Sequence, residues 1–184
     1  MKNDPTQPQP PKHPLVDAYI RVADSLSIAF GRLMAVFVVL LVLLIVHEVV
    51  RRYFFSSPTI WGLELQLFAY GTICMLSIPY ATYKKAHPRV PVLLDKCSPR
   101  VRYYLEILYI LVFFMPFVGV LVWWDAQVAY RSWFIQERSV LTAWMPLLWP
   151  IKATIPLGAA LVMVQGFAEL MKIIKNGGGA AHEL

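Results

Sequence analysis

The run LMAVFVVLLVLLIV, residues 33–46, contains no polar side chain. A helix that crosses the hydrocarbon core of a bilayer, about 30 Å thick, needs roughly 20 mostly apolar residues. Only helices and closed barrels satisfy their backbone hydrogen bonds in lipid, and a continuous apolar run lacks the alternation of a barrel strand. The run therefore predicts a membrane-spanning helix, which we place at residues 33–54.

The same character extends over most of the chain. Of 184 residues, 58% are hydrophobic and 15% are charged, whereas a soluble domain has about 45–50% apolar and about 25% charged residues. Further apolar stretches cover residues 58–83, 105–124 and 146–174. We predict an all-α integral membrane protein with four transmembrane helices, in a membrane domain over residues 32–175.

Serine and proline pairs suggest where two of these helices begin. Ser57 can cap a helix whose first residue is Pro58, because proline suits the position where no N–H is needed. Ser98 and Pro99 predict the start of the third helix in the same way. Pro116 predicts a kink within that third helix.

The two ends of the chain have a different composition. Residues 1–14 are polar and proline-rich, which predicts a disordered tail, and residues 176–184, NGGGAAHEL, predict a flexible one. Residues 15–31 carry apolar side chains at helical spacing with charges opposite, which predicts an N-terminal amphipathic helix in the membrane interface. The pattern also fits the start of a long first membrane helix, and both interpretations stay open.

Charge predicts the orientation of the chain. The net charge is +6, and twelve of the 17 lysines and arginines fall in the N-terminal region, in residues 84–102 and near the C-terminus. The positive-inside rule then places both termini in the cytoplasm, in a multi-pass protein of the bacterial inner membrane. Because the positive residues cluster in the segments beside the apolar runs, as the positive-inside rule expects, they do not indicate nucleic-acid binding.

Reactive side chains inside the predicted spans are few. His47, Glu48 and Glu64 lie near helix ends, and no ionisable residue lies in the middle of a span, where a proton relay or an ion site is expected. We therefore expect no enzyme activity, no metal and no cofactor. The alternative is a membrane anchor subunit that binds haem or quinone in a redox complex, but haem ligation needs two facing histidines, and only His47 lies in a span.

The turn between the first two helices carries two arginines and a carboxylate. We predict an ion pair between Arg52 and Glu64, with Tyr53 and Trp61 packed beside it, because a carboxylate one turn inside a helix should not stay unpaired. The other interpretation of Arg51 and Arg52 is that they anchor the helix at the membrane interface.

At this turn the sequence resembles the small membrane subunit, the Q-type or DctQ-like subunit, of tripartite ATP-independent periplasmic (TRAP) transporters. The pattern R-Y-x-F-x-x-P-x-x-W-x-x-E is matched by Arg52, Tyr53, Phe55, Pro58, Trp61 and Glu64. A second pattern, H-x-R-V-x-V followed by L-x-P-R, is matched by His87, Arg89, Val90, Val92, Pro99 and Arg100. The sequence departs from the family at Leu63, where a second acidic residue is frequent, and at Pro91, where aspartate is common.

The resemblance implies a scaffold role in a sodium-coupled transporter for organic acid uptake. In that family a large multi-span membrane subunit carries the substrate and sodium sites, and a periplasmic substrate-binding protein delivers the substrate. The small subunit supports the large one and helps dock the binding protein, so it has no substrate site of its own. We expect Arg52, Tyr53, Trp61 and Glu64 to act at the partner interface or as a structural tie.

The segment at residues 84–102 is expected to meet lipid or the partner subunit. Its apolar residues are too few to span a membrane, so we predict that the segment lies on the membrane surface. Basic side chains would then contact the phosphate groups of membrane phospholipid. The candidates are Lys84, Lys85, His87, Arg89 and Arg100.

Overall fold

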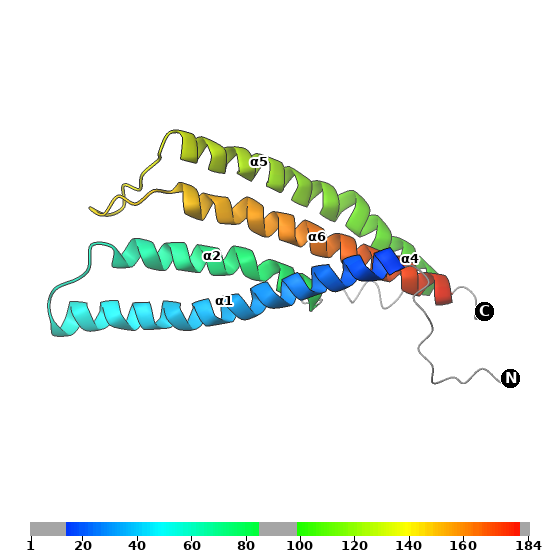
Figure 1. Cartoon of the computed structure of the whole chain (residues 1–184), viewed down its shortest axis with the longest axis horizontal. Helices are drawn as coiled ribbons and strands as arrows, with labels where there is room; N and C mark the ends of the chain where they lie inside the picture. The colour runs from blue at the N-terminus through cyan, green and yellow to red at the C-terminus, as the bar shows by residue number, and fades with distance from the viewer. Residues whose placement is uncertain (1–13, 85–98, 181–184) are drawn as a thin grey trace.

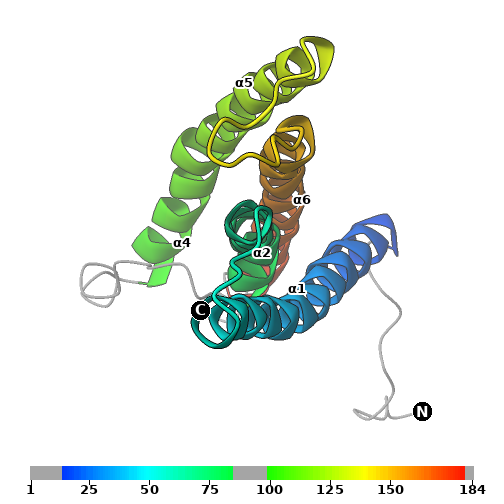
Figure 2. The ribbon, with the colours of Figure 1, turned by 90° about the vertical axis from the view of Figure 1, so that its left-hand side faces the viewer.

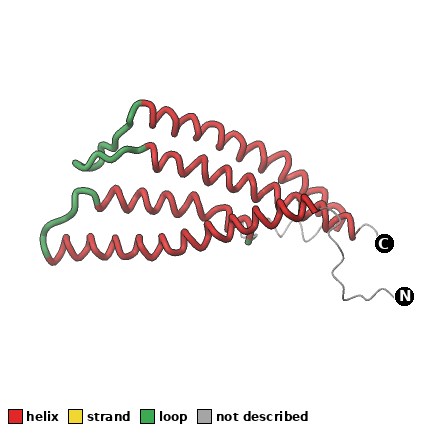
Figure 3. Tube along the Cα trace, viewed as in Figure 1, coloured by secondary structure: helices red, strands yellow, loops and turns green. Residues whose placement is uncertain are grey.

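The computed structural model describes residues 14–84 and 99–180. The elements are α1 (Pro14–Phe54), α2 (Gly62–Tyr83), α4 (Pro99–Leu108), the π-helix η1 (Tyr109–Phe114), α5 (Met115–Phe134) and α6 (Trp149–Ala180). Helices make up most of the described chain, which contains no named strand (Figure 3). The prediction of an all-α protein is confirmed.

α1, α2, the continuous stretch formed by α4, η1 and α5, and then α6 run in alternating directions (Figure 1). The start of α1 and the end of α6 lie at one end of the molecule, which we call the termini end. The connections at residues 55–61 and 135–148 lie at the opposite end, which we call the loop end. The polar groups described below gather at these two ends.

The helices pack side by side, with α2 between α1 and α6, and α5 on the other side of α6 (Figure 2). A small residue allows close contact between α2 and α6, since a Cβ on Gly158 would lie 2.7 Å from the Met75 carbonyl oxygen. Such close approach at small residues is typical of membrane helices. The splayed position of α5 leaves an open side between α5 and α2.

Apolar side chains point outward along much of the molecule. Within the described residues, three helical stretches are long and apolar enough to cross a membrane: Pro14–Phe54, Tyr103–Phe134 and Trp149–Lys175. Their apolar residues are mostly exposed, as lipid-facing side chains are. The fourth helix, α2, has 22 residues and lies in the same bundle but is not among these three stretches; it carries Glu64 and Gln66 near its start. Of the four predicted membrane spans, three are thus long and apolar enough to cross a membrane.

The first helix is one continuous element of 41 residues. Residues 15–31 do not form a separate amphipathic helix. They are the start of the long first helix, which was the other interpretation of the sequence. The reason is that Ala23, Ser27 and Met34 form one buried stripe that continues across the expected boundary. The helix starts at Pro14, which the sequence placed in the tail.

The second helix begins at Gly62, four residues later than predicted. Ser57 does not cap it. Instead, Ser56 adopts a positive φ of 48° and the Ser57 N–H donates to the Arg51 carbonyl at 3.1 Å. This hydrogen bond reaches back six residues and, together with the left-handed conformation of Ser56, closes the end of α1. The serines therefore end α1, and the chain to Trp61 stays non-helical.

The third helical stretch contains an irregularity just before Pro116. The π-helix η1 joins α4 to α5, and its end is marked by the Met115 N–H donating to the Ile110 carbonyl, five residues back. Pro116 cannot donate a backbone hydrogen bond, so the regular α-helical pattern is interrupted where the sequence predicted a kink.

The last helix starts at Trp149, three residues after the predicted Pro146, and runs to Ala180. Residues 176–180 of the predicted tail therefore continue the helix, because extending a helix is far easier than nucleating one. Residues 1–13 and 181–184 lie outside the described part of the chain.

Candidate functional site

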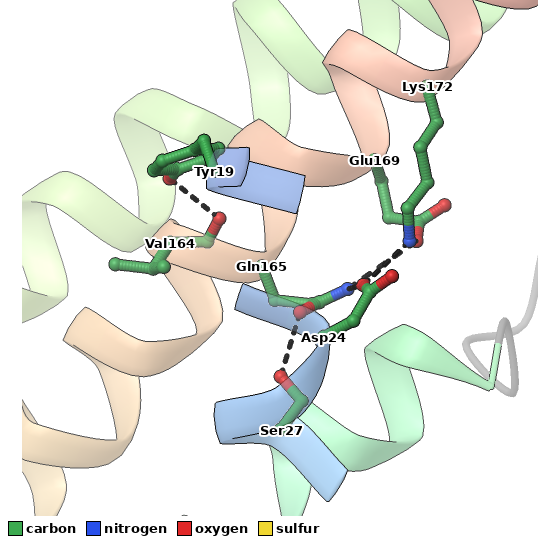
Figure 4. Close-up of polar contacts among 7 residues, drawn as sticks. All are labelled: Tyr19, Asp24, Ser27, Val164, Gln165, Glu169 and Lys172. Atoms are coloured by element: carbon green, nitrogen blue, oxygen red, sulfur yellow. Dashed lines mark hydrogen bonds and ion pairs between the residues drawn. The ribbon is translucent and has the colours of Figure 1, made fainter. Parts of the chain in front are cut away.

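Gln165 of α6 is fully buried at the termini end and is held by two residues of α1 (Figure 4). Ser27 Oγ donates to Gln165 Oε1 at 2.8 Å, and Gln165 Nε2 donates to Asp24 Oδ1 at 2.9 Å. Three and four residues are one helical turn, so Asp24 and Ser27 share a face of α1. Two polar groups on that face thus satisfy both ends of a single buried amide.

Two lysines of α6 extend this contact to carboxylates of α1, and Figure 4 shows the first of them, Lys172. Lys172 Nζ lies 2.7 Å from Asp24 Oδ1 and 2.8 Å from Glu169 Oε1. Lys175 Nζ lies 2.5 Å from Asp17 Oδ1, and the Tyr19 hydroxyl donates to the Val164 carbonyl at 3.0 Å. We call this set the termini-end network: Asp17, Tyr19, Asp24, Ser27, Gln165, Glu169, Lys172 and Lys175. It joins the first part of α1 to the last part of α6.

The sequence analysis did not pair these residues. A signal was present, because Gln165, Glu169 and Lys172 recur at intervals of four and three along a mostly apolar helix. Asp17 and Asp24 are likewise two turns apart on one face of α1. The sequence does not show how α1 and α6 cross, and the crossing decides which of these residues meet.

At the loop end, Glu48 is buried and accepts hydrogen bonds from the turn after α1. The Thr59 hydroxyl and the Thr59 N–H both donate to Glu48 Oε2, the latter at 3.4 Å. Gly62 lies against the same carboxylate, since a Cβ there would be 2.6 Å from Glu48 Oε2. Glu48 thus fixes the turn between α1 and α2.

The predicted ion pair between Arg52 and Glu64 is wrong. Arg52 Nη2 lies 3.4 Å from Glu48 Oε1, one turn back on the same helix, and its side chain is 59% exposed. Glu64 is 0% exposed, and neither of its carboxylate oxygens has a hydrogen-bond partner in the described chain. The spacing of four residues makes Glu48 the local partner of Arg52, and the late start of α2 alters the geometry on which the prediction relied.

The aromatic residues of the predicted tie are separated. Trp61 stacks on His47, with ring centroids 6.0 Å apart and planes at 15°. Tyr53 is 77% exposed and makes no hydrogen bond or ring contact with a described residue. Trp61 therefore packs on His47 of α1.

The second loop, residues 135–148, is closed at its base. An isolated bridge joins Arg138 to Leu147, and Lys152 Nζ of α6 lies 2.5 Å from Glu137 Oε2. The hydrogen bond from Lys152 holds the pKa of the Glu137 carboxyl below its usual value. The tip of the loop is apolar and open, and Val140 is 90% exposed.

The predicted lipid-contact residues are only partly described. Lys84 is exposed and its Nζ lies 5.8 Å from the centre of the Tyr80 ring and 5.7 Å from that of Tyr83. Arg100 belongs to the first turn of α4. Three others, Lys85, His87 and Arg89, lie outside the described residues.

The polar side chains at both ends of the bundle form hydrogen bonds and ion pairs with other residues of the same chain. Charged side chains join α1 to α6 at the termini end, and the buried Glu48 joins α1 to the turn before α2 at the loop end. A family described as "Tripartite ATP-independent periplasmic transporters, DctQ component" matches residues 41–176, which is most of the chain. The chain belongs to the DctQ family. The predicted resemblance to the DctQ-like small subunit is thereby confirmed.

The match to the DctQ family covers the loop end completely but only part of the termini end. Residues 14–40 of α1 lie outside it, and with them Asp17, Asp24 and Ser27. A search of curated proteins finds no match to the sequence. As a DctQ component, the chain is a TRAP transporter small permease subunit, and the redox-anchor alternative finds no support.

Proposed function

We propose that this DctQ component serves as the static scaffold of a sodium-coupled TRAP transporter for organic acid uptake. In this proposal it supports the large membrane subunit and helps dock the periplasmic substrate-binding protein. It has no catalytic or transport site of its own, and it lies in the bacterial inner membrane with both termini in the cytoplasm.

The observation that carries the scaffold role is the use of charged groups as ties between helices. Lys172 and Lys175 hold α6 to Asp24 and Asp17 of α1. Ion pairs that fix two helices at one end oppose relative movement of those helices. A subunit built in this way suits a fixed support better than a moving transport domain.

The loop end suits a docking role. The tip of the loop at residues 135–148 presents exposed apolar side chains, Val140 and Leu141 among them, on a base closed by Glu137 and Lys152. Exposed apolar residues on a preorganised loop favour a protein contact, because little conformational entropy is lost on binding. In the proposed orientation this loop faces the periplasm.

Reconstitution tests the proposal directly. Proteoliposomes containing the large subunit, this chain and the binding protein should take up an organic acid when a sodium gradient is applied. Omitting this chain should abolish uptake while the binding protein keeps its affinity for the substrate. Uptake by this chain alone, or a large subunit that works equally well without it, would contradict the scaffold role.

A further inference from the structure

An apolar groove lies on the open side of the bundle between α2 and α5. Its cavity volume is about 510 Å³. Side chains of α2 and of η1 and α5 form its walls, and α6 forms its floor; among them are Met75, Ile78, Phe113, Phe117, Ile155 and Ala159. Aromatic and long aliphatic side chains form much of the groove's lining.

The size of the groove limits what it can hold. Its lining on one wall runs from Tyr109 to Asp125, which at 1.5 Å per residue is about 24 Å. Dividing the volume by this length gives a mean cross-section of about 21 Å². A single extended hydrocarbon chain fits the length and width of this groove.

One polar side chain lines the groove at its end nearest the loops. Asp125 is half-buried and makes no hydrogen bond or ion pair with any residue that the structure describes. A carboxylate in a membrane helix is costly without a partner, so an unpaired one indicates a ligand that carries a positive charge or hydrogen-bond donors. Phosphate alone, as in an anionic lipid, would be repelled.

We propose that the groove binds one acyl chain of a glycerophospholipid whose head group carries a primary amine. The chain lies along the apolar walls, and the ammonium group donates a charge-assisted hydrogen bond to Asp125. A trimethylated amine has no N–H to donate, so a choline head group fits less well. The lipid comes from the leaflet nearer the loop end. This site is independent of substrate transport.

Native mass spectrometry of the purified full chain tests the site. The protein is mixed with phosphatidylethanolamine, phosphatidylcholine or phosphatidylglycerol with identical acyl chains. We expect one phosphatidylethanolamine to be retained, at least about tenfold more than either other lipid, as a hydrogen bond to a charged group implies. Asp125→Asn should remove this preference, and equal retention of the three lipids by the unchanged protein would overturn it.

Two matched substitutions separate the groove from the rest of the surface. Ala159→Phe fills the groove and should abolish retention, while Ala126→Phe, on an exposed position of α5 outside the groove, should leave retention unchanged. Helical content by circular dichroism checks that both variants fold. If Ala159→Phe does not fold, Asp125→Asn decides. Retention by a folded Ala159→Phe, or a photo-crosslinker at Phe117 that captures the large subunit in place of lipid, would overturn the proposal.

Discussion

Ser27 and Gln165, 138 positions apart in the sequence, are joined by a hydrogen bond of 2.8 Å in the interior of the bundle. Gln165 is fully buried and uses its amide nitrogen on Asp24 at the same time. A buried amide must have partners for both of its ends, and these two contacts supply them. The first helix is therefore fixed to the last at a defined position along both.

Gln165→Leu should destabilise the chain. The substitution keeps a similar volume but leaves Ser27 and Asp24 without their amide partner, which costs about 1–3 kcal/mol. Thermal unfolding in detergent should show a lower midpoint. Gln127→Leu, on an exposed position of α5, is the control and should change stability by no more than about 0.5 kcal/mol. Equal effects of the two variants would show that the buried contact is unimportant.

Gly62→Ala should disturb the turn between α1 and α2. The added Cβ would lie 2.6 Å from Glu48 Oε2, so the carboxylate or the turn must move, at a cost of about 1–3 kcal/mol. Gly119→Ala provides the matched control, because its Cβ would be 3.7 Å from the nearest side-chain atom, Met163 Cε. The two unfolding midpoints are compared, and a Gly62 variant as stable as the Gly119 variant would contradict the described turn.

Glu64→Gln should stabilise the isolated chain. A buried carboxylate with no partner is more costly than a neutral amide, so we expect a gain of about 1–3 kcal/mol. Glu48→Gln should have the opposite effect, because Glu48 accepts hydrogen bonds from Thr59 and Arg52. Both are measured by thermal unfolding of the purified chain. A Glu64 variant that loses as much stability as the Glu48 variant would mean that Glu64 has a partner after all.

Acid should weaken the base of the second loop. The pKa of Glu137 is lowered in the folded chain by the hydrogen bond from Lys152, so the ion pair contributes stability at neutral pH. That contribution declines as the pH falls below the ordinary glutamate value of about 4.3 and is lost through the lowered pKa. The difference in unfolding midpoint between the unchanged chain and Glu137→Gln should therefore shrink on acidification. A difference that stays constant at every pH would argue against the pair.

Cysteine labelling should place the two ends of the bundle on opposite sides of the membrane. In a background without Cys74 and Cys97, we expect a membrane-impermeant reagent applied from the periplasm to label Val140→Cys and not Lys84→Cys. Both positions are exposed, so access is limited by the membrane and not by the protein. Permeabilised cells, in which both should react, provide the control. Labelling of both in intact cells would contradict the proposed orientation.

The helices could be predicted from the sequence because long apolar runs leave few alternatives. Residues 33–46 and 105–124 both lie within helices as expected. Helix starts were less certain, since Ser57 and Pro58 suit either a helix cap or a turn. The structure uses Ser57 in the turn, where Arg51 holds its carbonyl oxygen and its hydroxyl, each at 3.1 Å.

The polar contacts were harder to predict because several partners were available to each charge. Arg52 could reach Glu48 along its own helix or Glu64 across the turn, and only the length of the turn decides between them. Asp24 and Lys172 are 148 positions apart, and no local pattern links them. Such pairs depend on the crossing of two helices, which the packing of the whole bundle determines.

The π-helix in the third helical stretch amounts to one extra residue within an α-helix. Each residue of an α-helix turns the chain by about 100°. The wider π turn absorbs this extra residue. If the same residues of Tyr109–Phe114 formed a regular α-helix, the extra residue would rotate all of α5 by about a quarter turn, and Asp125 would face away from the groove. The π-helix therefore keeps α5 in the orientation that places Asp125 at the groove, and it does so through the backbone alone.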